Sequence, residues 1–169
     1  AQVDYRALNV GTYPWARLDS PLRQLDLGGI AKGYAVDVLA DMLCEAGFSC
    51  FVIDGGGDLR IGAPPPGKEG WRIQFPDGTY RELSRVALAT SGDRYRYLYH
   101  RGQRYSHLID PRTGLGISHG YAVTVEARSC TQADALASAL SILGPEQGPP
   151  WLSSRPVQFF YPAKAVFYR

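Results

Sequence analysis

Two residues with hard oxygen atoms stand four positions apart in a segment that has helical spacing. Residues 131–143 carry apolar side chains at the intervals of an amphipathic helix, so Asp134 and Ser138 point to the same side of it. A carboxylate and a hydroxyl suit Mg²⁺, which commonly keeps water or phosphate oxygens in its remaining positions. Residues 131–134 (TQAD) also match a capping box, in which Asp134 only closes the start of its own helix. Taken alone, the pattern favours the cap.

A second group of candidates lies where residues 25–37 run from an apolar segment through two glycines into a predicted helix. A glycine such as Gly28 lets a ligand approach the backbone closely, and a helix start presents unpaired N–H groups to an anion. Lys32 adds a cation at the same end. The segment is therefore a candidate cradle for a phosphate or pyrophosphate. The alternative is an ordinary turn followed by a solvated lysine.

Two loops hold further polar candidates. Residues 107–114 (HLIDPRTG) contain His107, which could carry a proton near neutral pH, and Asp110, which occupies the first position of a β-turn motif. In the structural alternative, Asp110 caps only its own turn. Residues 90–93 (TSGD) could present a hydroxyl and a carboxylate to a ligand, or simply form a turn.

These candidates depend on two predicted helices. The first runs from about Ile30 to Glu45 and ends at an Ala-Gly signal, and the second closes at a Gly-Pro pair after residue 143. One face of the first helix is expected to be buried because its apolar residues recur at helical spacing: Ala31, Ala35, Val38, Leu39, Met42 and Leu43.

Strands are expected in much of the remaining chain. Alternating or apolar runs predict strands at 3–10, 51–53, 59–61, 71–75, 86–89, 95–99, 121–126, 157–161 and 165–168, with a turn at 90–93. The helices do not alternate regularly with the strands. This favours a single mixed α+β domain over residues 1–169, built mostly from antiparallel strands.

Composition narrows the class of protein. The chain has 169 residues, a net charge of +2, 45% hydrophobic and 20% charged residues, as expected for an ordinary globular domain without the electrostatic footprint of nucleic-acid binding. No apolar run is long enough to span a bilayer, so no transmembrane segment is predicted. The cysteines, Cys44, Cys50 and Cys130, form no CxxC pair, which disfavours a structural zinc site and leaves a Cys44–Cys50 disulfide open.

Taken in order, these segments resemble the FAD:protein FMN transferase family, also called ApbE-like. The resemblance spans nearly the whole chain and rests on residues 26–37 (DLGGIAKGYAVD), 55–58 (GGGD), 90–93 (TSGD), 107–114 (HLIDPRTG) and 133–140 (ADALASAL), followed by Gly144. It implies an ApbE-like core related to the T-fold. The blocks at 26–37 and 107–114 are long enough to be specific.

The resemblance implies an enzyme that binds FAD and Mg²⁺ and joins FMN to a Thr or Ser of an acceptor flavoprotein, with release of AMP. Carried over by position, the metal ligands are the Asp134 carboxylate, the Ser138 hydroxyl and the Ala31 backbone carbonyl. Together with Lys32 from the helix start, the residues expected around the flavin nucleotide are Gly28, Tyr34, Ser91, Gly92, Asp93 and Ile109. His107 is the candidate for proton handling or substrate orientation, and Asp110 competes with it.

Two features depart from the family pattern. Relatives carry a substantial region before the DLGGIAKG block, whereas residues 1–25 precede it here, so part of the FAD site is expected to be missing or to be built in another way. The family usually has threonine at the position of Ser138. A serine keeps the hydroxyl but loses the methyl group that fixes its rotamer.

The resemblance leaves two other functions open. One is FAD pyrophosphate hydrolysis to FMN and AMP, with water replacing the acceptor hydroxyl. The other is a non-catalytic flavin-binding domain, which the short N-terminal region favours. Family members are usually exported and tethered to the membrane, so the expected location is the bacterial periplasm, although no leader is visible in this sequence.

Overall fold

The computed structural model describes residues 4–12, 14–92, 96–152 and 158–160. Its centre is a five-stranded sheet in which every neighbouring pair is antiparallel. The strand order is β13 (Gln158–Phe160), β12 (Val123–Ala127), β7 (Val86–Ser91), β4 (Leu59–Ile61) and β3 (Val52–Asp54). The predicted α+β class is confirmed.

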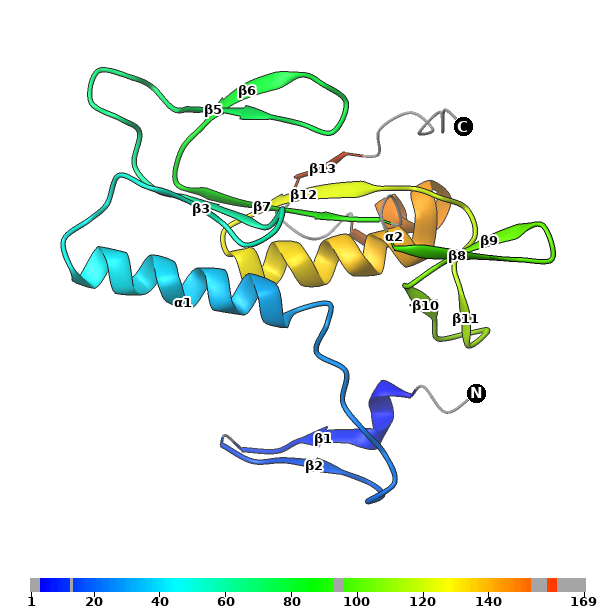
Figure 1. The fold of residues 1–169 in the computed structure, drawn as a ribbon. Coiled ribbons are helices and arrows are strands. Elements are labelled where there is room, and N and C mark those ends of the chain that lie inside the picture. Colours follow the sequence, from blue (N-terminus) through cyan, green and yellow to red (C-terminus); the bar gives the residue numbers. More distant parts are fainter. Residues whose placement is uncertain (1–3, 13, 93–95, 153–157, 161–169) are drawn as a thin grey trace.

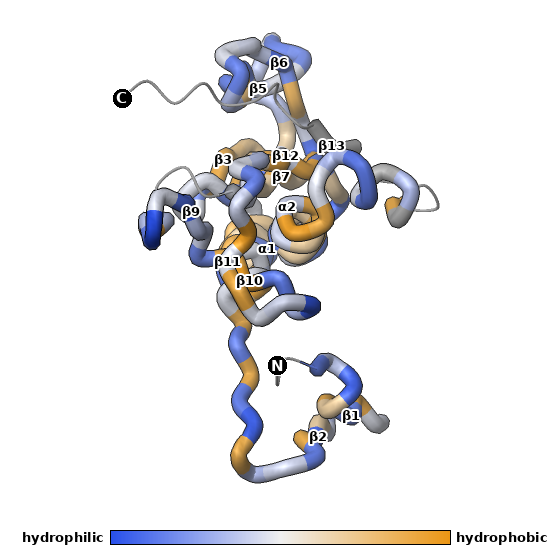
Figure 2. The backbone as a smooth tube through the Cα atoms, turned by 90° about the vertical axis from the view of Figure 1, so that its right-hand side faces the viewer, coloured by the Kyte–Doolittle hydropathy of each residue, from blue (hydrophilic) through white to orange (hydrophobic). Residues whose placement is uncertain are grey.

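Two helices lie side by side along one face of this sheet (Figures 1 and 2). They are α1 (Ala31–Glu45) and α2 (Cys130–Leu152). Gly144 interrupts α2 with a φ of 73°, a backbone conformation that glycine tolerates, so the predicted end of this helix is a kink after which helical structure resumes. The predicted bounds of the first helix agree with α1.

The alternation of side chains along β7 joins the two sides of the sheet. Ala87 and Ala89 face the helices, where their small side chains let the helices approach the sheet, and Leu88 faces the other side. Leu88 packs there with Ile61 and Phe75 under the hairpin formed by β5 (Trp71–Gln74) and β6 (Tyr80–Leu83). β7 is therefore packed on both of its faces, with α2 against one of them.

Smaller elements surround this body. The 3-10 helix η1 (Tyr5–Ala7) leads into a hairpin that stands apart from the sheet in Figures 1 and 2. That hairpin pairs β1 (Leu8–Val10) with β2 (Ala16–Leu18). Two further two-stranded sheets in the described ranges pair β8 (Tyr97–His100) with β9 (Gln103–Ser106) and β10 (Ile109–Asp110) with β11 (Leu115–Gly116). Within the described ranges, no helix combines the length and the apolar character needed to cross a membrane.

Several predicted strand bounds need correction. The strand expected at 3–10 begins only at Leu8, because Asp4 caps the short helix that precedes it. The turn expected at 90–93 is wrong in its first half, since Thr90 and Ser91 belong to β7 and pair with β12. β13 confirms one of the two terminal strands, and residues 165–168 lie outside the described residues. All three cysteines are free thiols.

The expected buried face of α1 is also wrong. Leu39 and Met42 are 50% and 59% exposed, Ala31, Ala35 and Val38 are exposed as well, and Leu43 is half-buried. The buried side instead carries Gly33, Val36 and Ala40, whose small side chains let α1 lie close against α2 and the sheet. An apolar stripe of α1 is therefore open to solvent in this chain.

Candidate functional site

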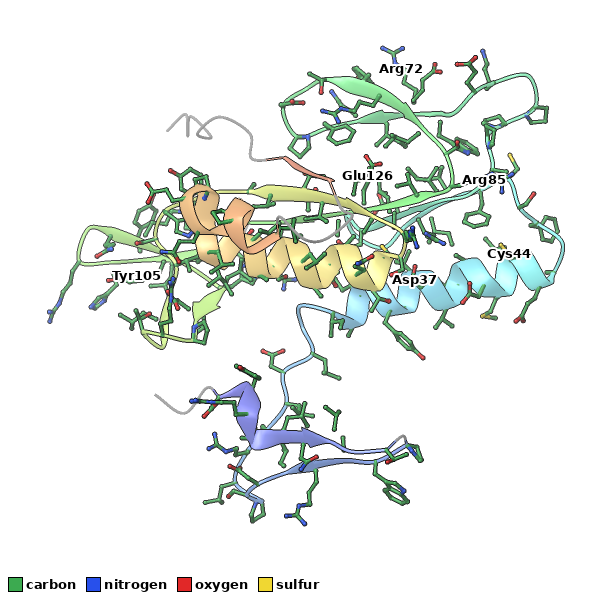
Figure 3. The ribbon with its side chains drawn as sticks, turned by 180° about the vertical axis from the view of Figure 1, so that it is seen from behind. Asp37, Cys44, Arg72, Arg85, Tyr105 and Glu126 are labelled. Carbon is green, nitrogen blue, oxygen red and sulfur yellow. The ribbon has the colours of Figure 1, made fainter. Side chains whose placement is uncertain are left out.

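The beginnings of α1 and α2 meet, and each helix start is capped by a carboxylate from the other helix. Asp37 of α1 accepts hydrogen bonds from the backbone N–H groups of Cys130 and Thr131, both at 2.8 Å, and from the Thr131 hydroxyl at 2.6 Å. Figure 3 shows Asp37 at this junction. In return, Asp134 Oδ2 accepts from the N–H of Gly33 at 3.1 Å. The first N–H groups of a helix have no acceptor within that helix, and here each helix supplies a carboxylate acceptor to the start of the other.

This exchange requires a glycine at position 33. A Cβ atom there would meet the backbone of Cys130 and Thr131, with the Thr131 nitrogen only 2.8 Å away. Without that atom the two helix starts come close enough for Asp134 to reach across. Gly33 is therefore a packing requirement of the site.

The geometry rejects the capping-box interpretation of Asp134. The start of α2 is capped by Ser129, whose hydroxyl accepts from the Gln132 N–H at 3.2 Å, together with Asp37. The Thr131 hydroxyl, which the motif assigns to its own helix, donates to Asp37 instead. Asp134 is consequently free of the role that its local sequence suggests, and its carboxylate faces the start of α1.

Lys32 of α1 connects this junction to a third element, the loop between β3 and β4 that carries Asp58. Its ammonium forms an ion pair with Asp58 and reaches Asp134 Oδ1 at 3.4 Å. The side chains of Asp58 and Asp134 are only 2% and 5% exposed, whereas that of Lys32 is 51% exposed. Lys32 thus lies between solvent and a buried pair of carboxylates, with about half of its side chain exposed.

Asp58 is the functional candidate that the sequence analysis missed. It follows three glycines in the loop between β3 and β4, a run that entered the sequence analysis only as one block of the family resemblance. A Cβ at Gly55 would collide with the Val36 side chain, so the loop is pressed against α1. The available signal was a carboxylate placed directly before a buried strand, where burial demands a charged partner.

The electrostatics of the cluster follow from burial and pairing. Burial raises the pKa of Asp58, and Asp134 adds to this shift, while Lys32 opposes it. Burial tends to lower the pKa of Lys32, but the hydrogen bond and charge of Asp58, with the charge of Asp134, raise it above its ordinary value. The lysine is therefore held in its charged form, shared by two carboxylates.

Hydroxyl groups border the same cluster. Ser138, one turn after Asp134 on α2, has its oxygen 3.4 Å from that of Ser91 at the end of β7. A Cβ at Gly29 would lie 3.3 Å from the Ser138 oxygen, so the turn before α1 passes directly beside this serine. The structure thus brings together Lys32, Ser91, Asp134 and Ser138, four residues predicted from three separate parts of the sequence.

The donors in this cluster fit a hard divalent cation such as Mg²⁺. Asp134 and Ser138 supply oxygen atoms on the same side of α2, and the neighbouring Asp58 carboxylate is already paired with Lys32. Ala31 is the first residue of α1. Its carbonyl oxygen accepts one hydrogen bond within the helix and has a second lone pair that could bind a cation. Within the described residues no three His, Cys, Asp or Glu side chains form a group that could hold a metal ion by themselves, so a cation here would also need the Ser138 hydroxyl and backbone or phosphate oxygens.

The remaining candidates are not joined to this cluster by a hydrogen bond or ion pair among the described residues. His107 is exposed and its Nδ1 lies 3.1 Å from the Arg96 carbonyl. Asp110 accepts from the Arg112 N–H and side chain at 2.8 to 3.2 Å, and the Arg112 hydrogen bonds lower the pKa of this carboxyl. The turn interpretation of Asp110 is therefore confirmed, and the predicted catalytic roles of both residues stay predictions.

The nucleotide candidates lie on exposed or edge positions. The Gly28 N–H donates to Asp26 at 2.8 Å, and the side chains of Tyr34 and Ile109 are 63% and 46% exposed. Gly92 is needed for packing, because a Cβ there would lie 2.9 Å from Ala122. Asp93 lies outside the described residues. An open groove beside β1 and β2 contains none of the predicted site residues.

Comparisons with known proteins agree on one family. The sequence matches the ApbE family over residues 1–161. The FAD:protein FMN transferases of Vibrio cholerae and Escherichia coli K12 are 39% and 32% identical to it, over 77% and 83% of this chain. Each match covers 42% of the relative, so this chain spans about two fifths of the length of these curated relatives.

Solved structures give the same result. The apo form of the Pseudomonas stutzeri flavinyl transferase ApbE superimposes with a TM-score of 0.82 at 33% identity, covering 94% of this chain and 51% of that protein. The ApbE protein of Thermotoga maritima gives a TM-score of 0.81 at 29% identity, covering 94% and 54%. The arrangement of sheet and helices is therefore that of roughly half of these structures.

Proposed function

Because the chain belongs to the ApbE family, we propose that it transfers FMN from FAD to a Thr or Ser side chain of an acceptor protein, with Mg²⁺ at the Asp134–Ser138 cluster. In this reaction the acceptor hydroxyl oxygen bonds to the phosphorus of the FMN moiety and loses its proton. The phosphoanhydride bond to the AMP moiety breaks, and AMP leaves with the bridging oxygen. The relatives are FAD:protein FMN transferases, which supports FAD and a protein acceptor as the substrates.

The observation that carries the proposal is the meeting of Asp134, Ser138 and the start of α1 around Lys32. Phosphoryl transfer depends mainly on positioning and on neutralising phosphate charge, for which a covalent intermediate is unnecessary. Bound at these oxygens, Mg²⁺ would supply Lewis-acid neutralisation of the pyrophosphate. Lys32 can add a cation at the exposed mouth of the cluster, since half of its side chain is open to solvent.

The test is a direct assay of covalent flavin transfer. The chain is incubated with FAD, Mg²⁺ and an extract of its native host, and proteins are separated under denaturing conditions. Flavin fluorescence that stays with an acceptor band, with a mass gain of one FMN, supports the proposal. Release of FMN and AMP without any labelled protein would replace it with FAD hydrolysis, and FAD binding without turnover would replace it with a binding domain.

The variant Asp134→Asn tests the role of the carboxylate, because it keeps the size of the side chain and removes its charge. We expect labelling to fall at least about tenfold, because a charged ligand is lost. The expected periplasmic location stays a prediction, which fractionation of the native cells would test.

A further inference from the structure

Asp58 is a buried carboxylate whose charge is balanced by an ammonium that it shares with Asp134. Its side chain is 2% exposed, and its ion pair is with Lys32, which also lies 3.4 Å from Asp134 Oδ1. Two negative charges thus face one positive charge. A buried carboxylate without a cation is strongly disfavoured, so Asp58 and Lys32 depend on one another.

The two contacts of Lys32 are unequal. Lys32 forms a direct ion pair with Asp58, while its contact with Asp134, at 3.4 Å, is near the long limit of a hydrogen bond. Asp134 directs its other oxygen to the Gly33 N–H. Asp58 therefore holds the ammonium more firmly than Asp134 does, and leaves Asp134 with lone pairs that no lysine proton occupies.

The backbone fixes Asp58 in this place. The Gly55 N–H donates to the Asp58 carbonyl at 2.8 Å, which closes the loop between β3 and β4. The same loop is pressed against Val36 of α1, one turn after Lys32. Carboxylate and ammonium are consequently presented to each other by two elements that are themselves packed together.

We propose that Asp58 is a positioning residue for the metal site: it anchors the Lys32 ammonium, so that a divalent cation can take the Asp134 carboxylate without competition from the lysine. This inference rests on the proposed function for the identity of the site. It predicts that the effect of Asp58 on metal binding acts through Lys32.

The test is a double-substitution cycle that measures binding of Mn²⁺ alone, by the electron paramagnetic resonance signal of the free ion, and of Mg²⁺ by competition. In Asp58→Asn, Lys32 moves fully to Asp134, and metal affinity is expected to fall about 10- to 100-fold. In Lys32→Met, the competing cation is gone and affinity rises. When both substitutions are combined, the loss caused by Asp58→Asn shrinks at least about fivefold.

Asp54→Asn is the matched control, because Asp54 is the last residue of β3, directly before the same loop, and its Oδ1 accepts from the Gly57 N–H at 2.7 Å, a bond that asparagine can keep. Its metal affinity is expected to equal that of the wild type. Circular dichroism and the midpoint of thermal unfolding establish that each variant is folded, and Lys32→Arg provides a conservative second variant that should retain the coupling to Asp58.

Each outcome decides the inference separately from the function. If Asp58→Asn lowers metal affinity equally in the wild type and in Lys32→Met, or more in Lys32→Met, the inference is overturned. Asp58 would then act on the metal directly, as a ligand or through its negative charge. No loss in Asp58→Asn, or no Mn²⁺ binding by the wild type, would overturn the inference too. Coupled binding in a chain that transfers no FMN would support the inference and reject the proposed function.

Discussion

Replacing Gly33 by alanine adds one methyl group at the closest approach of α1 and α2. The new Cβ would lie 2.8 Å from the Thr131 nitrogen and still closer to the Cys130 backbone, so neither neighbour can turn away as a side chain could. The helices must separate. Separation weakens the bond from the Gly33 N–H to Asp134 and the three bonds that Asp37 accepts from the start of α2.

The expected cost exceeds the gain in helix propensity. Alanine is favoured over glycine inside a helix by about 1 kcal/mol. Overpacking costs about 1–3 kcal/mol, and a hydrogen bond to a charged group contributes about 1.5–3 kcal/mol. Loss of a helix cap adds about 1 kcal/mol. We therefore expect Gly33→Ala to lower the free energy of unfolding by about 3 kcal/mol or more.

Urea denaturation followed by circular dichroism measures this change, with two glycine-to-alanine controls. At Gly11 a Cβ would meet nothing within 4 Å, and at Gly29 it would meet only the Ser138 side chain, which can rotate. Both controls should change the free energy of unfolding by less than about 1 kcal/mol. If Gly33→Ala were neutral, or stabilising by the helix propensity alone, the close contact between the helices and the reciprocal capping would both be wrong.

Three further predictions follow from burial and charge. The pKa of Lys32 is raised above 10.5, so the stability that its charge contributes is complete below that pH and is lost as the pH rises through the pKa of the folded state. The free energy of unfolding should therefore fall at alkaline pH, and this fall should be smaller in Lys32→Met. Burial raises the pKa of the Cys130 thiol to about 12, so at pH 8 a thiol reagent should modify the two exposed cysteines quickly and Cys130 only on unfolding. On α1, Leu39→Gln should change the free energy of unfolding by less than about 0.5 kcal/mol, whereas Val36→Ala, at a buried position, should cost about 2 kcal/mol.

Each of these three predictions would be contradicted by a specific result. An alkaline stability profile that Lys32→Met leaves unchanged would separate Lys32 from the buried carboxylates. Rapid modification of three thiols in the folded chain would place Cys130 at the surface. A large loss in Leu39→Gln would mean that the outer side of α1 is covered in solution.

The parts of the fold that depend on local sequence could be predicted from it. Glycines and apolar spacing located α1, and the interval between Asp134 and Ser138 correctly placed both on one side of α2. The mixed α+β class followed from the irregular order of helices and strands. These features are set by residues within a few positions of one another.

The errors concern contacts between residues far apart in the chain. The capping box at residues 131–134 failed because Asp37, more than 90 residues earlier, caps α2 instead. Asp58 was missed because its partner is 26 residues away on another element. The wrong face of α1 was chosen because large apolar residues were counted as buried, while the actual interface uses small ones such as Gly33.

Anomalous diffraction from a crystal soaked in Mn²⁺ would test the central claim most directly, because it locates the cation without an assay of turnover. We expect one peak at the junction of α1 and α2, bound by the Asp134 carboxylate and the Ser138 hydroxyl, with Lys32 still paired with Asp58. A crystal saturated with Mn²⁺ in which Asp134 binds only Gly33 and Lys32, and the cation lies elsewhere, would contradict it.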